Sequence, residues 1–163
     1  MCRIISAYES FPTIRHIMSF STKYVILVSP YTYIDVPKDR DFISQFEKDL
    51  DDVLSRDIQV LLLFGKNDKY KRYIDKKFPS KNFPNLYSRW VENLHCKIYM
   101  NENECLITSY NISNSVQSNF DLGILFNKEA NTNLFRDVFV YLKQIYHSIN
   151  EDKLEKFLFI NDI

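Results

Sequence analysis

The sequence predicts an α/β fold in which a mixed, largely parallel β-sheet is sandwiched between helices. Two continuous apolar runs, at 23–31 and 58–65, have the length and composition of strands that are buried on both faces. Between them, residues 41–57 repeat apolar side chains at intervals of three and four, the pattern of an amphipathic helix. A strand, a helix and a second strand in this order indicate a βαβ unit with a parallel strand pair.

Helical patterns flank this unit. Residues 6–19 have apolar positions at mixed helical spacing and are expected to form a first helix, with Pro12 near its start or at a kink. Residues 66–83 are polar and are expected to form a helix or a loop. Residues 131–149 are expected to form a closing helix, because four apolar side chains fall on one stripe. These four are Leu134, Val138, Leu142 and Ile145.

Three further segments have the composition of strands. They are 88–100, 104–110 and 119–126. No internal repeat, linker or low-complexity stretch interrupts the chain, and its 163 residues fit the usual size of one domain. We therefore expect a single domain over residues 1–163.

Composition excludes several classes of protein. Lysine plus arginine equals aspartate plus glutamate, at 21 each, so net charge does not mark a nucleic-acid or membrane protein. Two glycines cannot supply a Walker loop or a G-x-G-x-x-G turn. The three cysteines form no C-x-x-C pair and the three histidines have no zinc-ligand spacing. A reducing compartment and no metal or other cofactor are the simplest expectation.

The apolar runs are strand-sized rather than membrane-spanning, and the N-terminus has no apolar segment of signal-peptide length. We expect a soluble, cytoplasmic protein without a membrane span.

The stretch LHCKIYMNENECLITSYN, residues 94–111, places ionisable side chains in an apolar hairpin. Alternation along a strand puts His95 and Lys97 on one face. Burial of both without partners would cost several kcal/mol, roughly, so something must meet them. On the returning strand, Ser109 and Asn111 share a face, and the length of the turn decides whether it is the same one.

We expect an odd turn, in which position 100 pairs with 104 and three residues lie between them. Position 95 would then lie opposite Ser109, whereas an even turn would put the serine on the other side. Opposed side chains of a hairpin lie roughly 5 Å apart at Cβ, close enough to bind one small anion between them.

These residues together suit a phosphate. Lys97 supplies a positive charge, Ser109 and Asn111 supply neutral donors, and His95 can act as a nucleophile, since neutral imidazole is available near pH 7. Asp121, in the next predicted strand, is the candidate to hold the second ring nitrogen of His95.

The motif resembles that of the phospholipase D superfamily, H-x-K, four residues, D, six residues and G-S-x-N. His95-Cys96-Lys97 matches the first element, and TSYN at 108–111 is similar to the last. NFDLGILF at 119–126 is similar to the following strand of the family, which carries an acid before L-G or I-G. The resemblance covers residues 94–126 and, with the strand order upstream, implies one phospholipase D-like half-unit.

The chain departs from the family pattern at three points. Glu102 stands where the family has aspartate, the interval to T-S-x-N is one residue shorter, and Thr108 replaces glycine. Glu102 and Glu104 are expected to be solvated turn residues. These departures put in doubt a role for Glu102 and a close approach of the backbone to phosphate at residue 108.

Family members work with two motifs facing each other, and neither His16 nor His147 has a lysine two positions on. The resemblance therefore implies a homodimer with its site across the two-fold axis. It further implies that one His95 forms a phosphohistidine while the second protonates the leaving oxygen and then activates water. Lys97 and Asn111 of both chains would neutralise the phosphate oxygens, so that no metal is needed.

A segment at 66–81 indicates the substrate. It contains seven basic residues against two acids, with aromatic residues interleaved, a composition that suits a nucleic-acid backbone and unstacked bases. The candidate substrate-binding residues are Lys66, Lys69, Tyr70, Lys71 and Arg72. The other interpretation is a solvated helix face, and the inference depends on whether this segment borders the site.

Three functions remain open. The first is a metal-independent phosphodiesterase hydrolysing DNA or RNA, as a small dimeric nuclease. The second is a phospholipid phosphodiesterase, although the chain shows no amphipathic membrane-docking helix. The third is a non-catalytic nucleic-acid-binding module that keeps the fold and a phosphate pocket.

Overall fold

The computed structural model describes residues 2–30, 40–65, 69–112 and 121–147. The helices in this part of the chain are α1 (Ala7–Ser19), α2 (Arg40–Ser55), α3 (Lys69–Lys77) and α4 (Thr132–His147). The strands are β1 (Cys2–Ser6), β2 (Tyr24–Ser29), β3 (Gln59–Phe64), β4 (Leu86–Trp90), β5 (Ile98–Asn101), β6 (Glu104–Thr108) and β7 (Leu122–Asn127).

The strands form one mixed sheet in the order β1-β7-β6-β5-β2-β3-β4. The predicted parallel pair of the βαβ unit is confirmed, since β2 runs parallel to β3, and β3 runs parallel to β4. The other four pairings are antiparallel, so the expectation of a largely parallel sheet is only partly matched. The reason is the connection between β5 and β6, which is too short for the crossover that parallel strands require.

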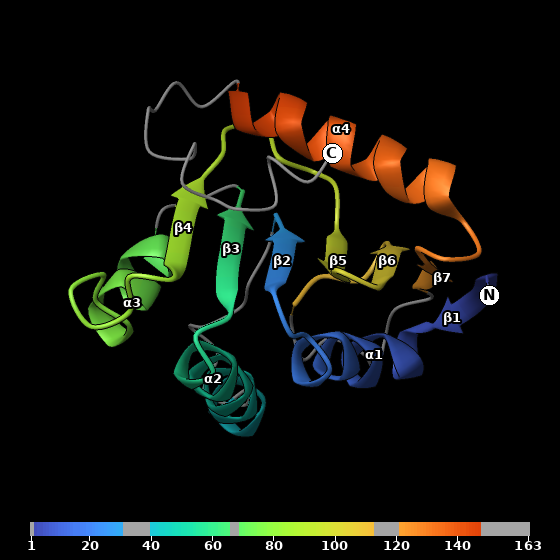
Figure 1. Ribbon diagram of the computed structural model, residues 1–163. Coiled ribbons are helices and arrows are strands. Elements are labelled where there is room, and N and C mark those ends of the chain that lie inside the picture. Colours follow the sequence, from blue (N-terminus) through green and yellow to red (C-terminus); the bar gives the residue numbers. More distant parts are fainter. Residues whose placement is uncertain (1, 31–39, 66–68, 113–120, 148–163) are drawn as a thin grey trace.

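Helices cover both faces of the sheet, with α1 and α2 on one side and α4 on the other (Figure 1). Strand β2 shows why its sequence is apolar throughout. Val25 and Leu27 pack into the core on the α1 and α2 side, whereas Ile26 and Val28 pack into the core beneath α4. Both faces of this strand are therefore buried, as the continuous apolar run indicated.

Strand β1 was not predicted. It pairs antiparallel with β7 at the edge of the sheet, and only Ile5 of its residues is buried. A short edge strand with one inward side chain leaves no clear alternation in the sequence. Pro12, which was expected near the start of the first helix or at a kink, lies inside α1.

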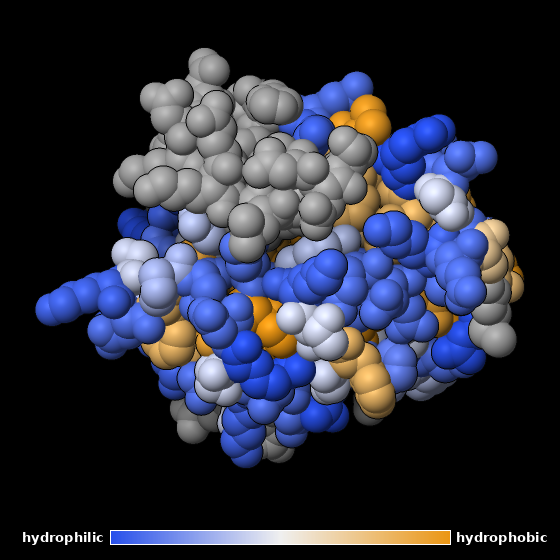
Figure 2. Space-filling view, viewed as in Figure 1, coloured by the Kyte–Doolittle hydropathy of each residue, from blue (hydrophilic) through white to orange (hydrophobic). Residues whose placement is uncertain are grey.

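The surface agrees with the mixed composition. Hydrophilic residues cover most of the face seen in Figure 2, and apolar residues appear there in small separate groups. Within the described residues, no helix combines the length and the apolar content that crossing a membrane would require.

Candidate active site

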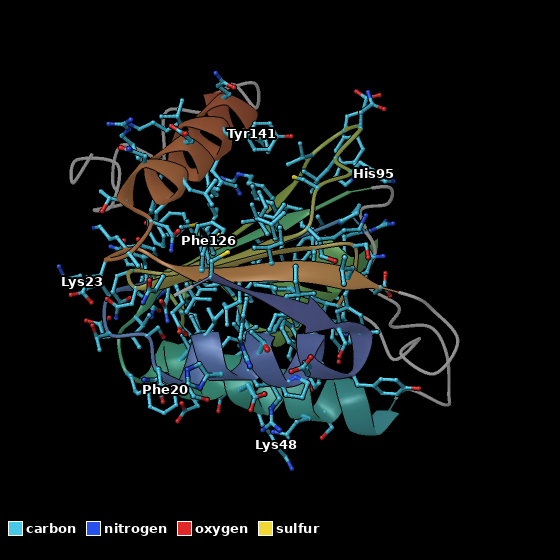
Figure 3. All side chains as sticks on the ribbon, turned by 90° about the vertical axis from the view of Figure 1, so that its right-hand side faces the viewer. Phe20, Lys23, Lys48, His95, Phe126 and Tyr141 are labelled. Atoms are coloured by element: carbon cyan, nitrogen blue, oxygen red, sulfur yellow. The ribbon has the colours of Figure 1, made fainter. Side chains whose placement is uncertain are left out.

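The predicted catalytic residues lie at one end of the sheet, where β2 and β6 end and β5 and β7 begin. The strand registers establish this, because Val28 near the end of β2 pairs with Ile98 at the start of β5. In the same way, Thr108 at the end of β6 pairs with Gly123 near the start of β7. Figure 3 shows His95 at this end, opposite Lys23, which precedes β2.

The chain that leads to His95 lies directly on Gly65, just after β3. A Cβ atom at Gly65 would come within 2.8 Å of the carbonyl oxygen of Leu94 and 2.9 Å of Cα of Pro30. Only glycine permits this approach without a shift of the backbone. The segment before His95 is therefore seated across the ends of β2 and β3.

His95 and Lys97 differ in their surroundings. The His95 side chain is exposed and makes no hydrogen bond or ion pair with the described residues. Lys97 is only 8% exposed, and its Nζ donates to the carbonyl oxygen of His95 at 2.9 Å. The buried ammonium thus lies against the backbone of the exposed histidine, and the imidazole is free to meet a ligand or a partner.

The expected odd turn was wrong. Met100 pairs with Cys105, which leaves four residues between them, and the amide of Thr108 donates to the carbonyl of Lys97 at 3.2 Å. Lys97 therefore lies opposite Thr108, and Ser109 does not lie opposite His95. The side chain of Asn101 explains the even turn, because its Oδ1 accepts from the amides of Asn103 and Glu104, each at 2.9 Å.

Ser109 and Asp121 are brought together, but not in the predicted way. The Ser109 hydroxyl donates to Oδ1 of Asp121 at 2.7 Å and accepts from the amide of Leu122 at 3.0 Å. Its single proton is thus used on the carboxylate and not held ready for a phosphate. No hydrogen bond joins Asp121 to His95 within the described chain, so the expected support of the imidazole is not what Asp121 provides here.

Asn111 has an unmet hydrogen-bonding atom. Its side chain is half-buried, and Oδ1 is fully buried without a hydrogen-bond partner in the described structure. Buried polar atoms are nearly always paired in folded proteins, so an exception at this place needs an explanation. A bound ligand or a second chain would supply the missing partner.

Glu102 and Glu104 are not the solvated turn residues that were expected. Glu102 accepts from the amide and hydroxyl of Thr22, at 2.8 and 2.7 Å, and from the amide of Lys23 at 3.4 Å. Glu104 pairs with Nε2 of His16 at 3.3 Å. Burial alone raises the pKa of Glu102, but the hydrogen bonds from Thr22 and Lys23 outweigh it, and the net pKa is lowered. Both acids stabilise the end of the hairpin remote from His95.

The basic segment follows Gly65, and the part of it that the structure describes includes α3, which packs against β4. Of its predicted substrate-binding residues, Lys66, Lys69 and Tyr70 lie outside the described side chains. Lys71 forms an ion pair with Asp75 at 2.5 Å, and Arg72 is exposed. The charge of Lys71 is thus partly neutralised inside α3, which weakens its case as a phosphate contact.

Two buried hydroxyl groups beneath this end of the sheet were not assigned a role from the sequence. They belong to Ser29, the last residue of β2, and Tyr99 in β5. The available signal was a serine that closes an otherwise apolar strand. No group of three or more His, Cys, Asp or Glu side chains suited to a metal ion occurs in the described ranges.

Comparison with known proteins gives a likeness of fold. No protein family model matches the chain, and no curated protein matches it by sequence. NucT from Helicobacter pylori superposes with a TM-score of 0.67 at 15% identity, over 91% of this chain and 96% of that chain. Nuc from Salmonella typhimurium, a phospholipase D family member, superposes with a TM-score of 0.57 at 13% identity, over 83% and 90%.

A third similar structure is TrmBL2, an archaeal chromatin protein described as having a novel mode of DNA binding. Its TM-score is 0.61 at 12% identity, over 88% of this chain and 53% of that chain. At such low identities these matches establish the fold and leave the activity to be argued from the site.

Proposed function

We propose that this chain, which has the fold of the phospholipase D family, is a phosphodiesterase that hydrolyses nucleic acid through a phosphohistidine at His95. The observation that carries the proposal is the meeting of two motif halves at one end of the sheet. The exposed imidazole of His95 and the buried ammonium of Lys97 come from the segment that leads directly into β5. Asn111, with its unpaired Oδ1, follows the end of β6.

The proposed reaction has two displacements. In the first, a ring nitrogen of His95 attacks phosphorus, the bond from phosphorus to the leaving oxygen breaks, and a general acid protonates that oxygen. In the second, water gives a proton to the group that acted as acid and attacks phosphorus. The bond between phosphorus and nitrogen breaks, which returns free His95 and a phosphate monoester.

Lys97 suits the charge that this reaction develops. The ammonium of Lys97, which lies against the backbone of His95, would place a positive charge beside a phosphate held there. The carboxamide of Asn111 would add a hydrogen bond by donating from Nδ2 to a phosphate oxygen. Preorganised donors of this kind contribute about 100- to 1,000-fold each in rate.

Ser109 and Asp121 take a different role from the one first expected. Since the serine proton is used on Asp121, we infer that this pair braces the start of β7 against the end of β6. In this role Ser109 keeps the Asp121 carboxylate in place, where its negative charge can stabilise a positively charged imidazole that approaches.

The general acid is supplied by a second copy of the chain. His16, the other histidine with a described side chain, pairs with Glu104 at the remote end of the hairpin. His95 of the partner subunit, brought across a two-fold axis, is therefore the proposed acid. The same approach would give the exposed His95 ring a carboxylate, which the described residues of its own chain do not provide.

Nucleic acid is the proposed substrate. Basic charge and aromatic residues between residues 66 and 81 support it, as does the start of that segment after Gly65, beside the chain that leads to His95. The likeness to the DNA-binding protein TrmBL2 supports a second candidate, a binding module without catalysis. The hydrogen bond from the Ser109 hydroxyl to Asp121 supports that alternative, because it leaves the serine proton unavailable to a phosphate.

The test is cleavage in the presence of EDTA. Purified protein is incubated with labelled single-stranded DNA, double-stranded DNA, RNA and a fluorescent phosphatidylcholine, alongside His95→Ala. We expect nucleic-acid cleavage that survives chelation and is lost in the variant. Lipid turnover would point to a phospholipid phosphodiesterase instead, and binding without cleavage would point to the binding module.

A further inference from the structure

Two hydrogen bonds beneath the candidate site fasten the segment after β6 to β2 and β5. Tyr99 is 0% exposed, and its hydroxyl donates to the carbonyl oxygen of Tyr110 at 3.0 Å. Ser29 is 1% exposed, and its Oγ accepts from the amide of Ile112 at 3.1 Å.

Both buried hydroxyl groups bond to the backbone that follows β6. The amide of Ile112 donates to Oγ of Ser29, and the phenol proton of Tyr99 goes to the carbonyl oxygen of Tyr110. Burial raises the pKa of Tyr99 well above its ordinary value, so the phenol keeps the proton that it donates.

The hydrogen bonds of Tyr99 and Ser29 fasten the backbone on either side of one residue. Residues 110 and 112 flank Asn111, the residue with the buried, unpaired Oδ1. Because these residues follow the end of β6 at Thr108, their position depends on contacts of this kind. The arrangement fixes the backbone from which the carboxamide projects.

We propose that Ser29 and Tyr99 are positioning residues, which aim the carboxamide of Asn111 at the phosphate through the backbone of Tyr110 and Ile112. The inference rests on the proposed function, since it assigns these residues to that reaction. Neither touches substrate. Their effect on the rate passes through Asn111, so it must disappear when the carboxamide is removed.

The experiment is a double-mutant cycle between Tyr99→Phe and Asn111→Ala, read in the folded protein as kcat and KM. Phenylalanine keeps the ring and removes only the hydroxyl. We expect Asn111→Ala to lower kcat about 100-fold and Tyr99→Phe about tenfold, with KM changed less than about twofold. Added to Asn111→Ala, Tyr99→Phe should change kcat by less than about twofold, because the group that it positions is already absent.

Two further variants keep the test decisive. Tyr24→Phe removes a buried tyrosine hydroxyl group at the other end of β2 and should leave kcat unchanged. Ser29→Ala removes the other hydrogen bond, the one to the amide of Ile112, and should also lower kcat. This variant replaces Tyr99→Phe in the test if Tyr99→Phe folds poorly. Thermal unfolding of each variant, monitored by circular dichroism, checks that every kcat is measured on folded protein.

The outcomes separate the two proposals. Wild-type protein without cleavage, indistinguishable from His95→Ala, would overturn the proposed function and the inference with it. Active wild-type protein in which Tyr99→Phe and Ser29→Ala match Tyr24→Phe would overturn the inference alone. So would a Tyr99→Phe effect of the same size with and without Asn111, because that result describes a general loss of structure.

Discussion

The two ends of the β5–β6 hairpin are built from the same strands and differ in how their polar side chains are hydrogen-bonded. At the turn, Asn101 donates to the carbonyl of Ile17 at 2.8 Å and accepts from two amides of the turn. Glu102 accepts from Thr22 and Lys23 in the neighbouring segment. The polar side chains at this end are satisfied within the chain.

The other end is open. The imidazole of His95 is exposed, the ammonium of Lys97 is buried against a carbonyl, and Oδ1 of Asn111 has no partner in the described structure. The comparison teaches that the polar side chains at the turn are bound within the fold, whereas His95 and Asn111 at the other end present groups without a hydrogen-bond partner among the described residues. Substitutions at the turn should therefore change stability, and substitutions at the open end should change activity.

The largest effect is expected at His95. His95→Ala should lower the rate of phosphodiester cleavage by at least about 1,000-fold, because it removes the nucleophile. The free energy of unfolding should change by less than about 0.5 kcal/mol, since the side chain is exposed. His16→Ala, at the turn end, is the matched control and should leave the rate unchanged. A His95 variant that remains active would break the comparison.

Lys97 gives the next effect. Lys97→Met keeps the length of the side chain and removes its charge, and kcat should fall about 100-fold. Stability should stay within about 1 kcal/mol of the wild type, because a buried charge is replaced by an apolar group. Steady-state kinetics and urea unfolding measure the two quantities. A large loss of stability with normal kcat would show that Lys97 stabilises the fold and has no part in catalysis.

A mixing experiment tests whether the open end is completed by a second copy. Wild-type protein equilibrated with about a fourfold excess of His95→Ala should lose activity to about one fifth, since most wild-type chains would then have an inactive partner. The same excess of His16→Ala serves as the control for added protein. Activity per wild-type chain that does not respond to the His95 variant would show that each chain works alone.

The smallest effect is expected at the turn. Glu102→Gln should cost about 1 kcal/mol of unfolding free energy at pH 7 and leave kcat unchanged, because it removes a charge from hydrogen bonds to Thr22 and Lys23. The pKa of Glu102 is lowered in the folded state, so the ionised group stabilises the fold above its unfolded pKa of about 4.3.

That stabilisation is lost as the pH falls through the lower, folded pKa. The stability difference between wild type and Glu102→Gln should therefore be constant near neutral pH and shrink below about pH 4. Unfolding curves at several pH values measure it. A difference that grows on acidification would contradict the assigned direction.

Much of the fold followed from the sequence, because β2, α2 and β3 have long, unbroken patterns. The expectation of a largely parallel sheet is only partly matched, since the sequence shows where strands occur but not the direction in which each one runs. The hairpin register was wrong, because one residue of turn length reverses the outcome and the side chain of Asn101 decides it.

The candidate site was predicted as a set of residue types and not as a set of contacts. His95, Lys97, Ser109, Asn111 and Asp121 do come to one end of the sheet. The pairing of Ser109 with Asp121, and the place of Ser29 and Tyr99 beneath Asn111, depend on the even register and on distant strands. The spacing of residues along the sequence carries no information about the hairpin register or about contacts with distant strands.

The most direct test of the central claim is to trap the covalent intermediate. Protein is mixed with an oligonucleotide carrying radioactive phosphorus at the scissile phosphate, quenched within the first turnover in alkaline detergent, and separated by electrophoresis. We expect label on the protein that is stable to alkali, released by acid, located at His95 by peptide mapping and absent from His95→Ala. Rapid cleavage of the same oligonucleotide with no label on the protein at any time would contradict the account.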